Sequence, residues 1–196
     1  NGILFGNGTS AIGATAVGTD NQVLTSNGSG SAPTFQDAGG GGYTLGTPVA
    51  TTSGSSVSFT GVASGVTSVV LSFSEMSLSG GDQVTVQIGD SGGLETSGYI
   101  HTIYGFDYSS PNWSNSTSNI LMYSASSSNV LSGTVTFNLL NASTNLWVWT
   151  VMYKYGTGQV YFGAGSKPLS SRLTQLAIDT TGSNSFDNGS ANIKYI

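Results

Sequence analysis

Three aromatic residues stand among small hydrogen-bonding residues in segment 105–117, which reads GFDYSSPNWSNST. Exposed aromatic rings stack on the faces of sugar rings, and nearby hydroxyl, amide and carboxyl groups bond to sugar hydroxyls, as in adaptable binding loops. We expect the segment to be a long loop between two strands that contacts a sugar or a receptor. Alternatively, its aromatic rings pack back on the core or into a neighbouring subunit. The candidate ligand-binding residues are Phe106, Asp107, Tyr108, Asn112 and Trp113.

The sequence Gly89-Asp90-Ser91-Gly92-Gly93 is similar to the stretch around the nucleophile of chymotrypsin-like serine proteases. Those enzymes need a His that takes the Ser proton and an Asp that orients the His. In that family the His precedes the Ser, whereas the single histidine of this chain, His101, follows it. Leu94 also stands where the family usually has Pro. We therefore expect a glycine-rich loop that closes a strand at 83–89, with His101 on the next strand, and not a protease.

The other candidates for chemistry are scattered carboxylates. Ca²⁺ takes oxygen ligands from loops, but no EF-hand spacing is present. A Ca²⁺ site made of loop carboxylates remains an alternative, and its candidate ligands are Asp82, Asp90, Glu95 and Asp107. A glycosidase needs two carboxylates that flank the scissile bond, and the candidate pairs, Asp90/Glu95 and Asp179/Asp187, lie in turn-like sequence. Since the chain also has no Cys and only one His, we predict no enzyme, no metal centre and no cofactor.

The chain is poor in charge. Of its 196 residues 7% are charged, against about 25% in a typical soluble domain. The net charge is −5 and Lys and Arg together number four, too few for the basic face that nucleic acid binding needs. No apolar run approaches the roughly 20 residues that span a bilayer, so we expect no membrane insertion.

The first residues of the chain and its lack of Cys lead to two further expectations. No signal peptide is visible and the first residue is not Met, from which we expect a processed or truncated product. The absence of Cys fits folding in a reducing cytoplasm, where oligomerisation takes the place of disulfides as a source of stability.

From residue 43 onward, apolar runs of strand length follow one another about every ten residues, bounded by Gly, Ser, Asn or Asp. No segment shows a sustained helical period. Many short strands without helices predict an all-β fold, an antiparallel β-sandwich of jelly-roll-like form. The expected strands cover residues 43–51, 56–62, 67–77, 83–89, 98–105, 118–124, 131–140, 146–155, 159–163, 171–179 and 191–195.

Two of these runs alternate most clearly. Residues 84–88, VTVQI, have one apolar and one polar face, as in a half-buried strand. Residues 147–155, WVWTVMYKY, place their aromatic side chains and Val151 on one face. Because Val148 and Met152 stand on the second face, we expect this strand to be buried on both sides for part of its length.

Residues 1–38 differ from the rest, since their apolar residues are too sparse to build a core of their own. We expect an extended stalk whose thin apolar seam is buried against copies of itself, in preference to a flexible linker. Residues 39–42 are a run of glycine and act as a hinge. We therefore place the stalk and hinge at 1–42 and the sandwich head at 43–196. The apolar residues of the expected stalk are Ile3, Leu4, Phe5, Ile12, Val17, Val23, Leu24 and Phe35.

Residues 18–35, GTDNQVLTSNGSGSAPTF, resemble a segment common in fibre and structural proteins of tailed bacteriophages, with the pattern G-T-x-x-Q-V-L-T-S-N-G-x-G-x-x-P-T-[FW]. Residues 89–99, GDSGGLETSGY, are similar to a motif in C-terminal domains of structural proteins from marine tailed phages. Residues 185–193, SFDNGSANI, look like the closing strand of the same domains.

This resemblance implies a homotrimeric fibre tip, made in the host cytoplasm and carried on the virion, that is attached to other virion proteins through its N-terminal side. Its expected function is attachment to a host receptor, in particular a cell-surface glycan, with avidity from three weak sites on one tip. The resemblance carries over no receptor-contacting residue. The alternatives are a capsid-decorating or head-fibre protein, an extracellular lectin or adhesin, and a glycan depolymerase.

Overall fold

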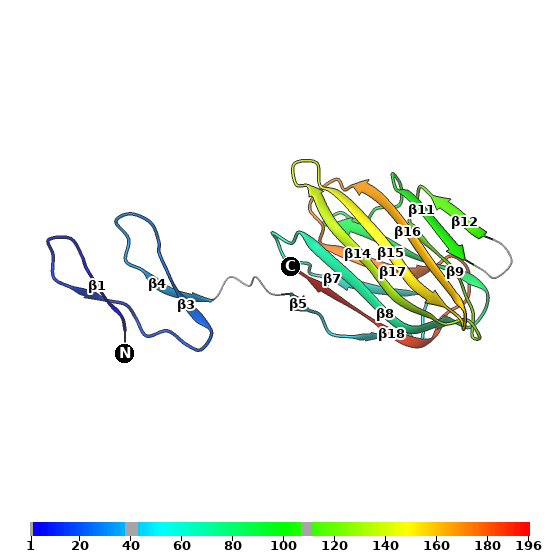
Figure 1. Cartoon of the computed structure of the whole chain (residues 1–196), viewed down its shortest axis with the longest axis horizontal. Helices are drawn as coiled ribbons and strands as arrows, with labels where there is room; N and C mark the ends of the chain where they lie inside the picture. The colour runs from blue at the N-terminus through cyan, green and yellow to red at the C-terminus, as the bar shows by residue number, and fades with distance from the viewer. Residues whose placement is uncertain (1, 38–42, 107–110) are drawn as a thin grey trace. The chain divides into compact units, whose positions relative to one another are not determined.

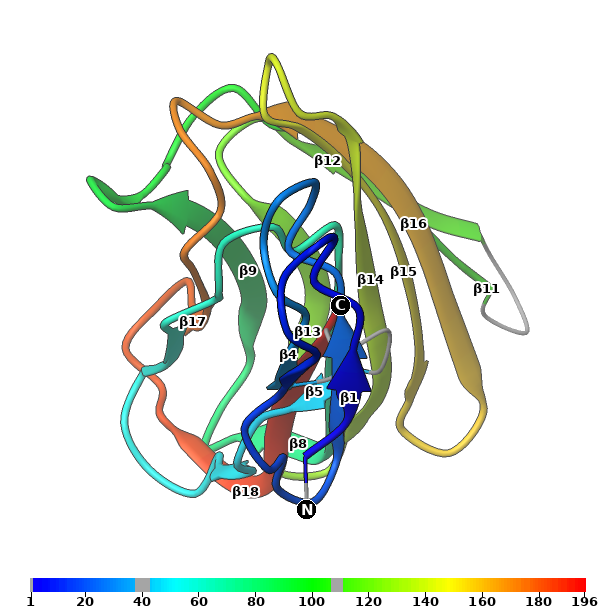
Figure 2. The same cartoon turned by 90° about the vertical axis from the view of Figure 1, so that its left-hand side faces the viewer.

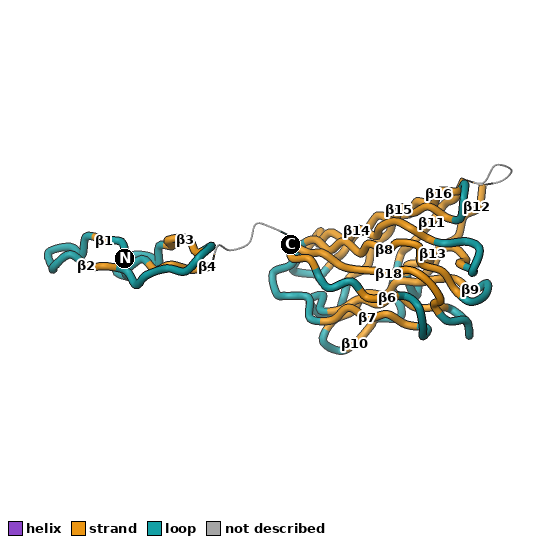
Figure 3. The backbone as a smooth tube through the Cα atoms, turned by 90° about the horizontal axis from the view of Figure 1, so that it is seen from below, coloured by secondary structure: helices purple, strands orange, loops and turns teal. Residues whose placement is uncertain are grey.

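The computed structural model describes residues 2–37, 43–106 and 111–196. By its internal contacts the chain divides into two compact units, Asn1–Tyr43 and Thr44–Ile196 (Figure 1). The described residues form strands, turns and irregular segments, with no helix among them (Figure 3). The predicted all-β class is therefore confirmed.

The first unit consists of two small β-hairpins. Strand β1 (Leu4–Phe5) pairs with β2 (Gly13–Ala14), and β3 (Gln22–Thr25) pairs with β4 (Thr34–Asp37), both antiparallel. None of residues 2–37 is fully buried, so this unit has no closed core of its own. Its large exposed apolar side chains are Ile3, Leu4, Ile12, Val17, Val23 and Leu24.

The second unit contains a large antiparallel sheet. Across it, the described strands run in the order β12, β11, β16, β15, β14, β8, β18, and the short strands β5 and β6 both pair with β18 at the far edge. The bounds are β12 (Pro111–Ser116), β11 (Ile100–Phe106), β16 (Gln159–Pro168), β15 (Leu146–Tyr155), β14 (Leu131–Asn141), β8 (Ser68–Leu78), β18 (Phe186–Tyr195), β5 (Thr44–Leu45) and β6 (Val49–Ala50).

A smaller antiparallel sheet covers one face of the large one. Its order is β10, β9, β17, β7, and β13 pairs with β9 along the same edge as β10. The bounds are β10 (Gly93–Leu94), β9 (Asp82–Asp90), β17 (Gln175–Thr180), β7 (Ser56–Thr60) and β13 (Ile120–Ala125). Figure 2 shows β9 and β17 in a layer opposite β14, β15 and β16. The predicted antiparallel sandwich is confirmed.

The core lies between the two sheets and is built by strand alternation. Leu71, Val135 and Val151 point inward from the large sheet, and Val86 and Ile178 meet them from the small one. Because side chains alternate between the faces of a strand, each strand of the large sheet gives one set of residues to this core and presents the other set on its outer face.

Strand β15 corrects one expectation about burial. Trp147, Trp149, Val151 and Tyr153 are buried, as the alternation predicted. Met152, however, is 63% exposed, so the prediction that this strand is covered on both sides is wrong at that position. The reason is that its second face is the outer face of the large sheet, which no other described layer covers.

Segment 105–117 also differs from its prediction, because residues 111–116 form strand β12 instead of a loop. Strand β12 pairs with β11 at the edge of the large sheet, from His101 opposite Ser116 to Phe106 opposite Pro111. Proline is tolerated at the first residue of an edge strand, since its missing N–H breaks no ladder there. The pairing with β11 outweighs the weak strand preference of Asn and Ser.

Candidate functional site

Four large side chains lie side by side across the outer face of the large sheet. Trp113 of β12 is opposite Tyr104 of β11, Tyr104 is opposite Phe162 of β16, and Phe162 is opposite Met152 of β15. Directly opposed residues share one face of a sheet, and neighbouring strands are about 4.8 Å apart. We call Trp113, Tyr104, Phe162 and Met152 the outer row.

The outer row is open to solvent over most of its length. Trp113 is 66% exposed, Met152 63% and Phe162 46%, while Tyr104 is half-buried. The rings of Tyr104 and Phe162 are in contact, with centroids 5.6 Å apart and planes tilted by 43°. Val160, two residues before Phe162 and therefore on the same face, is also exposed. The result is a continuous apolar and aromatic strip on a rigid sheet.

A polar row runs beside this strip, two residues along each strand. Thr102 is opposite Asn115 on one side and Ala164 on the other, and Ala164 is opposite Thr150. All four are exposed. Hydroxyl and amide groups therefore lie next to the aromatic rings, an arrangement that suits a ligand with both apolar faces and hydroxyl groups.

Among the side chains that the structure describes, one of the sequence-predicted ligand residues belongs to the outer row. Asp107 and Tyr108 lie outside the described residues, and Phe106 is the last residue of β11. Asn112 and Trp113 are neighbours in β12 and therefore point to opposite faces, with Asn112 opposite Gly105. Of the five candidates, Trp113 alone is placed in the outer row.

Tyr104, Phe162 and Met152 were not predicted as site residues from the sequence. They fall within the predicted strands 98–105, 159–163 and 146–155, but alternation does not say which face of a strand a second layer will cover. The available signal was Phe162 and Val160 flanking the buried Tyr161, which gives β16 large apolar side chains on both faces.

The GDSGG motif is a tight hairpin. Strand β9 ends at Asp90, and β10 returns from Gly93, which is opposite Asp90. The Asp90 carboxylate accepts a hydrogen bond of 2.7 Å from the Gly92 amide. Both ring nitrogens of His101 are engaged elsewhere, Nε2 with the Leu121 carbonyl at 3.0 Å and Nδ1 with the Trp149 indole at 3.2 Å. The predicted glycine-rich closure of the strand is confirmed, and His101 is on β11.

An ion pair between the buried Lys167 and the partly buried Glu95 fixes the segment after this hairpin. Nζ of Lys167 is 2.6 Å from the Glu95 carboxylate and donates a 2.6 Å hydrogen bond to the Ser97 carbonyl. The amide of Ser170 donates a 2.6 Å bond to the same carboxylate. Burial opposes ionisation of Glu95, but the bonds from Lys167 and Ser170 outweigh it, and the pKa of Glu95 lies below its usual value. Glu95 thus has a structural role.

Metal ligands do not gather in the described part of the chain. Among residues 2–37, 43–106 and 111–196 there is no group of three or more His, Asp or Glu side chains that could hold an ion. These residues also contain no helix that could span a membrane. Comparison of the chain with protein-family models, with curated proteins and with solved structures gives no match.

Proposed function

We propose that this chain is the tip of a phage virion fibre and that its sandwich attaches to a host-surface glycan through the outer row. The observation that carries the proposal is the exposure of Trp113, Phe162 and Met152 in one continuous strip. Single exposed apolar side chains are ordinary, whereas contiguous exposed patches mark interaction sites. The strip is built on paired strands, so its rings are held in place before a ligand arrives.

Sugar rings have the chemistry that fits this surface. Their C–H faces stack on aromatic rings, while their hydroxyl groups can bond to the side chains of Thr102, Asn115 and Thr150 in the neighbouring polar row. The chain has four Lys and Arg residues and a net charge of −5, so long-range attraction of an acidic polymer is disfavoured. We therefore propose a neutral glycan chain that lies across the strands, along the row.

Trimerisation through the first unit would supply avidity. Leu4, Ile12 and Val17 are exposed in the first unit, which lacks a closed core, and burial between three copies would remove them from water. Three weak sites on one tip then act together through effective concentration, so each site need not bind tightly.

The experiment compares two side chains of equal exposure. Trp113→Ala removes the outermost ring of the row, and Leu140→Ala removes an apolar side chain that is also 66% exposed but lies at the end of β14, outside the row. We expect Trp113→Ala to lower the affinity of a single site for a neutral glycan at least about tenfold, equivalent to about 1.4 kcal/mol, and to lower retention on host cells. Leu140→Ala should bind like the original protein.

Two outcomes would contradict the proposal. In one, Trp113→Ala and a Phe162→Ala variant keep full retention. In the other, these variants change only the association state of the protein, which would make the row a surface between copies. Thermal unfolding of each variant checks that the sandwich is intact. Labelling of intact particles with an antibody against the head would separate a tail fibre from a capsid-decorating protein.

A further inference from the structure

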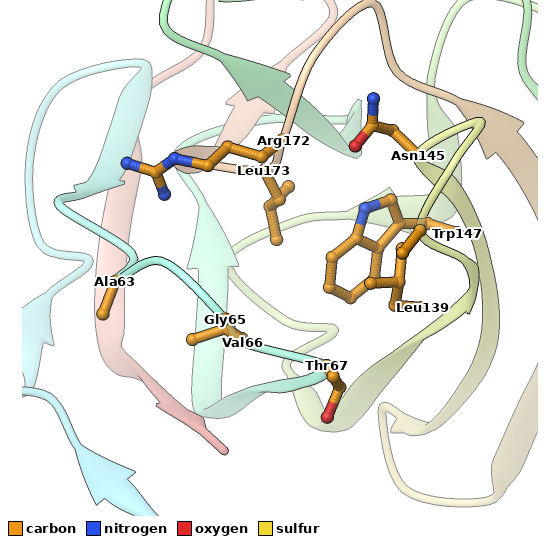
Figure 4. A pocket seen from close by; sticks show the side chains of 10 residues that line it. Ala63, Gly65, Val66, Thr67, Leu139, Asn145, Trp147, Arg172 and Leu173 are labelled. Atoms are coloured by element: carbon orange, nitrogen blue, oxygen red, sulfur yellow. The ribbon is translucent and has the colours of Figure 1, made fainter. Parts of the chain in front are cut away.

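A pocket of about 300 Å³ lies between the turn after β14 and the segments that precede β8 and β17. This volume is at the lower end of the range for small-molecule sites. Val66, Leu139 and Leu173 form apolar walls, and Trp147, Asn145 and Arg172 contribute polar groups (Figure 4). None of these six residues belongs to the outer row.

The indole nitrogen of Trp147 is a buried donor without an acceptor. The side chain is 2% exposed, and Nε1 has no hydrogen-bond partner in the described part of the chain. The neighbouring Trp149, two residues along the same strand, has its Nε1 paired with His101. Buried N–H groups are almost always paired, so the exception at Trp147 calls for an acceptor that the described residues do not supply.

Asn145 supplies a polar group beside this donor. It lies in the turn before β15 with a left-handed φ of 48°, and its carbonyl accepts a 3.1 Å bond from the Leu169 amide. In Figure 4 its side-chain oxygen points toward the indole nitrogen of Trp147, but no hydrogen bond joins them. An N–H donor and an amide that face each other across a gap complement a ligand amide, whose carbonyl accepts and whose N–H donates.

The other residues that line the pocket match the remaining parts of a ligand that carries an amide. Val66, Leu139 and Leu173 offer apolar contacts for a methyl group. Arg172 is exposed and uses Nη1 to donate a 3.2 Å bond to the Val62 carbonyl, and its guanidinium points away from Trp147 and Asn145 (Figure 4), where its further N–H donors would meet hydroxyls of a sugar ring that extends out of the pocket. A methyl, a carbonyl and an N–H beside ring hydroxyls together describe the acetamido group of an amino sugar.

We infer that this pocket binds the acetamido group of an N-acetylated hexosamine, with the carbonyl oxygen on Trp147 Nε1 and the N–H on the Asn145 amide. The choice of a sugar as the carrier rests on the proposed function, while the acetamido group rests on the pocket itself. The indole nitrogen has almost no exposed surface, so binding requires the Asn145 side chain to rotate away from it and admit the acetamido carbonyl. The pocket would add a selective subsite to the aromatic strip.

The test follows the indole N–H signals of the ¹⁵N-labelled full chain by NMR during titration with N-acetylglucosamine. We expect the Trp147 signal, assigned by its loss in Trp147→Phe, to move downfield as its proton gains an acceptor. The Trp149 signal is the internal control, because its proton is already bonded to His101 and should stay in place. Glucosamine and glucose, which lack the acetyl group, should leave both signals unchanged.

Two variants test the contacts by affinity. Trp147→Phe keeps an aromatic side chain but removes the donor, and Asn145→Gly removes the amide at a left-handed φ that glycine adopts without strain. Each should weaken binding of N-acetylglucosamine at least about tenfold, and thermal unfolding should show that both variants still fold, with a lower melting temperature for Trp147→Phe because the smaller ring leaves a cavity.

The outcomes separate this inference from the proposed function. An unmoved Trp147 signal, or an equal shift with glucose, overturns the inference. A shift with N-methylacetamide but not with N-acetylglucosamine overturns the assignment to a sugar. If the N-acetylglucosamine shift appears while Trp113→Ala leaves cell retention intact, the pocket stands and attachment through the outer row fails.

Discussion

The indole nitrogen of Trp149 donates a 3.2 Å hydrogen bond to Nδ1 of His101 in the interior of the sandwich. Nδ1 is therefore an acceptor, and Nε2, 3.0 Å from the Leu121 carbonyl, carries the ring proton. The two bonds fix a neutral imidazole and connect β15 and β11 of the large sheet with β13 of the small one. His101 therefore joins the two layers.

This arrangement predicts a loss of stability in mild acid. Burial lowers the pKa of His101 below its usual value of about 6.5, although the bonds to backbone carbonyls oppose the shift in part. Below pH 6.5 the unfolded chain takes up a proton at this residue that the folded chain does not yet bind. We expect the free energy of unfolding in urea to be level from pH 8 to 7 and to fall from about pH 6.5 downward.

The control for this effect is His101→Gln, which keeps a hydrogen-bonding side chain but cannot titrate. Its unfolding free energy should change little between pH 7 and 5, because the carboxyl groups titrate mainly below that interval. A parent protein whose stability is constant from pH 7 to 5 would rule out a buried neutral His101.

Two isoleucines of strand β11 test which face of the large sheet is buried. Ile103 points into the core and is 1% exposed, whereas Ile100 lies on the outer face and is 71% exposed. We expect Ile103→Ala to lower the free energy of unfolding by about 2–5 kcal/mol, since it leaves a cavity, and Ile100→Ala to change it by about 0.5 kcal/mol or less. Urea unfolding measures both, and equal losses would show that the two faces are assigned wrongly.

The sequence pattern was sufficient to predict most strands, but it did not predict which face of each strand is buried. Strand 146–155 was predicted at its observed bounds, because Trp147, Trp149 and Val151 alternate strictly. Alternation separates the two faces of a strand, yet the exposure of Met152 depends on where the second sheet lies. That placement is set by contacts between distant segments, which leave no periodic signal in the chain.

The candidate site was harder to predict for the same reason. The outer row joins Trp113, Tyr104, Phe162 and Met152 through the register of four strands. The pocket likewise combines segments far apart in sequence. Strand β12 was missed because its Pro, Asn and Ser residues favour turns, and only pairing with β11 makes it a strand.

The ion pair between Lys167 and Glu95 predicts a large loss of stability when the Lys167 charge is removed. Lys167 is buried, contacts the Ser97 carbonyl and lies 5.0 Å from the centre of the Tyr99 ring. Lys167→Met would leave the Glu95 carboxylate without its counter-charge, and we expect it to cost about 3 kcal/mol of unfolding free energy. Lys154→Met, on the exposed face of the same sheet, is the matched control and should cost about 0.5 kcal/mol or less.

A double variant separates charge from packing at this pair. Adding Glu95→Gln to Lys167→Met removes the unpaired charge and should recover part of the lost stability. A loss below about 1 kcal/mol in the single Lys167→Met variant would mean that the pair is screened by water and contributes like a surface ion pair.

The exposed apolar side chains of the first unit predict self-association. Leu4 and Ile12 belong to the first hairpin and its turn, where no described residue is fully buried. We expect the intact chain to sediment as a trimer at micromolar concentration, and Leu4→Ser with Ile12→Ser to shift it toward monomer, because each change removes apolar surface that another copy would cover in the trimer. Leu140→Ser in the head, which replaces a similarly exposed side chain, should leave the trimer unchanged.

Sedimentation velocity over a dilution series measures the association state of all three proteins. A parent chain that stays monomeric throughout would remove the basis for avidity, because three sites on one tip require three copies of the chain.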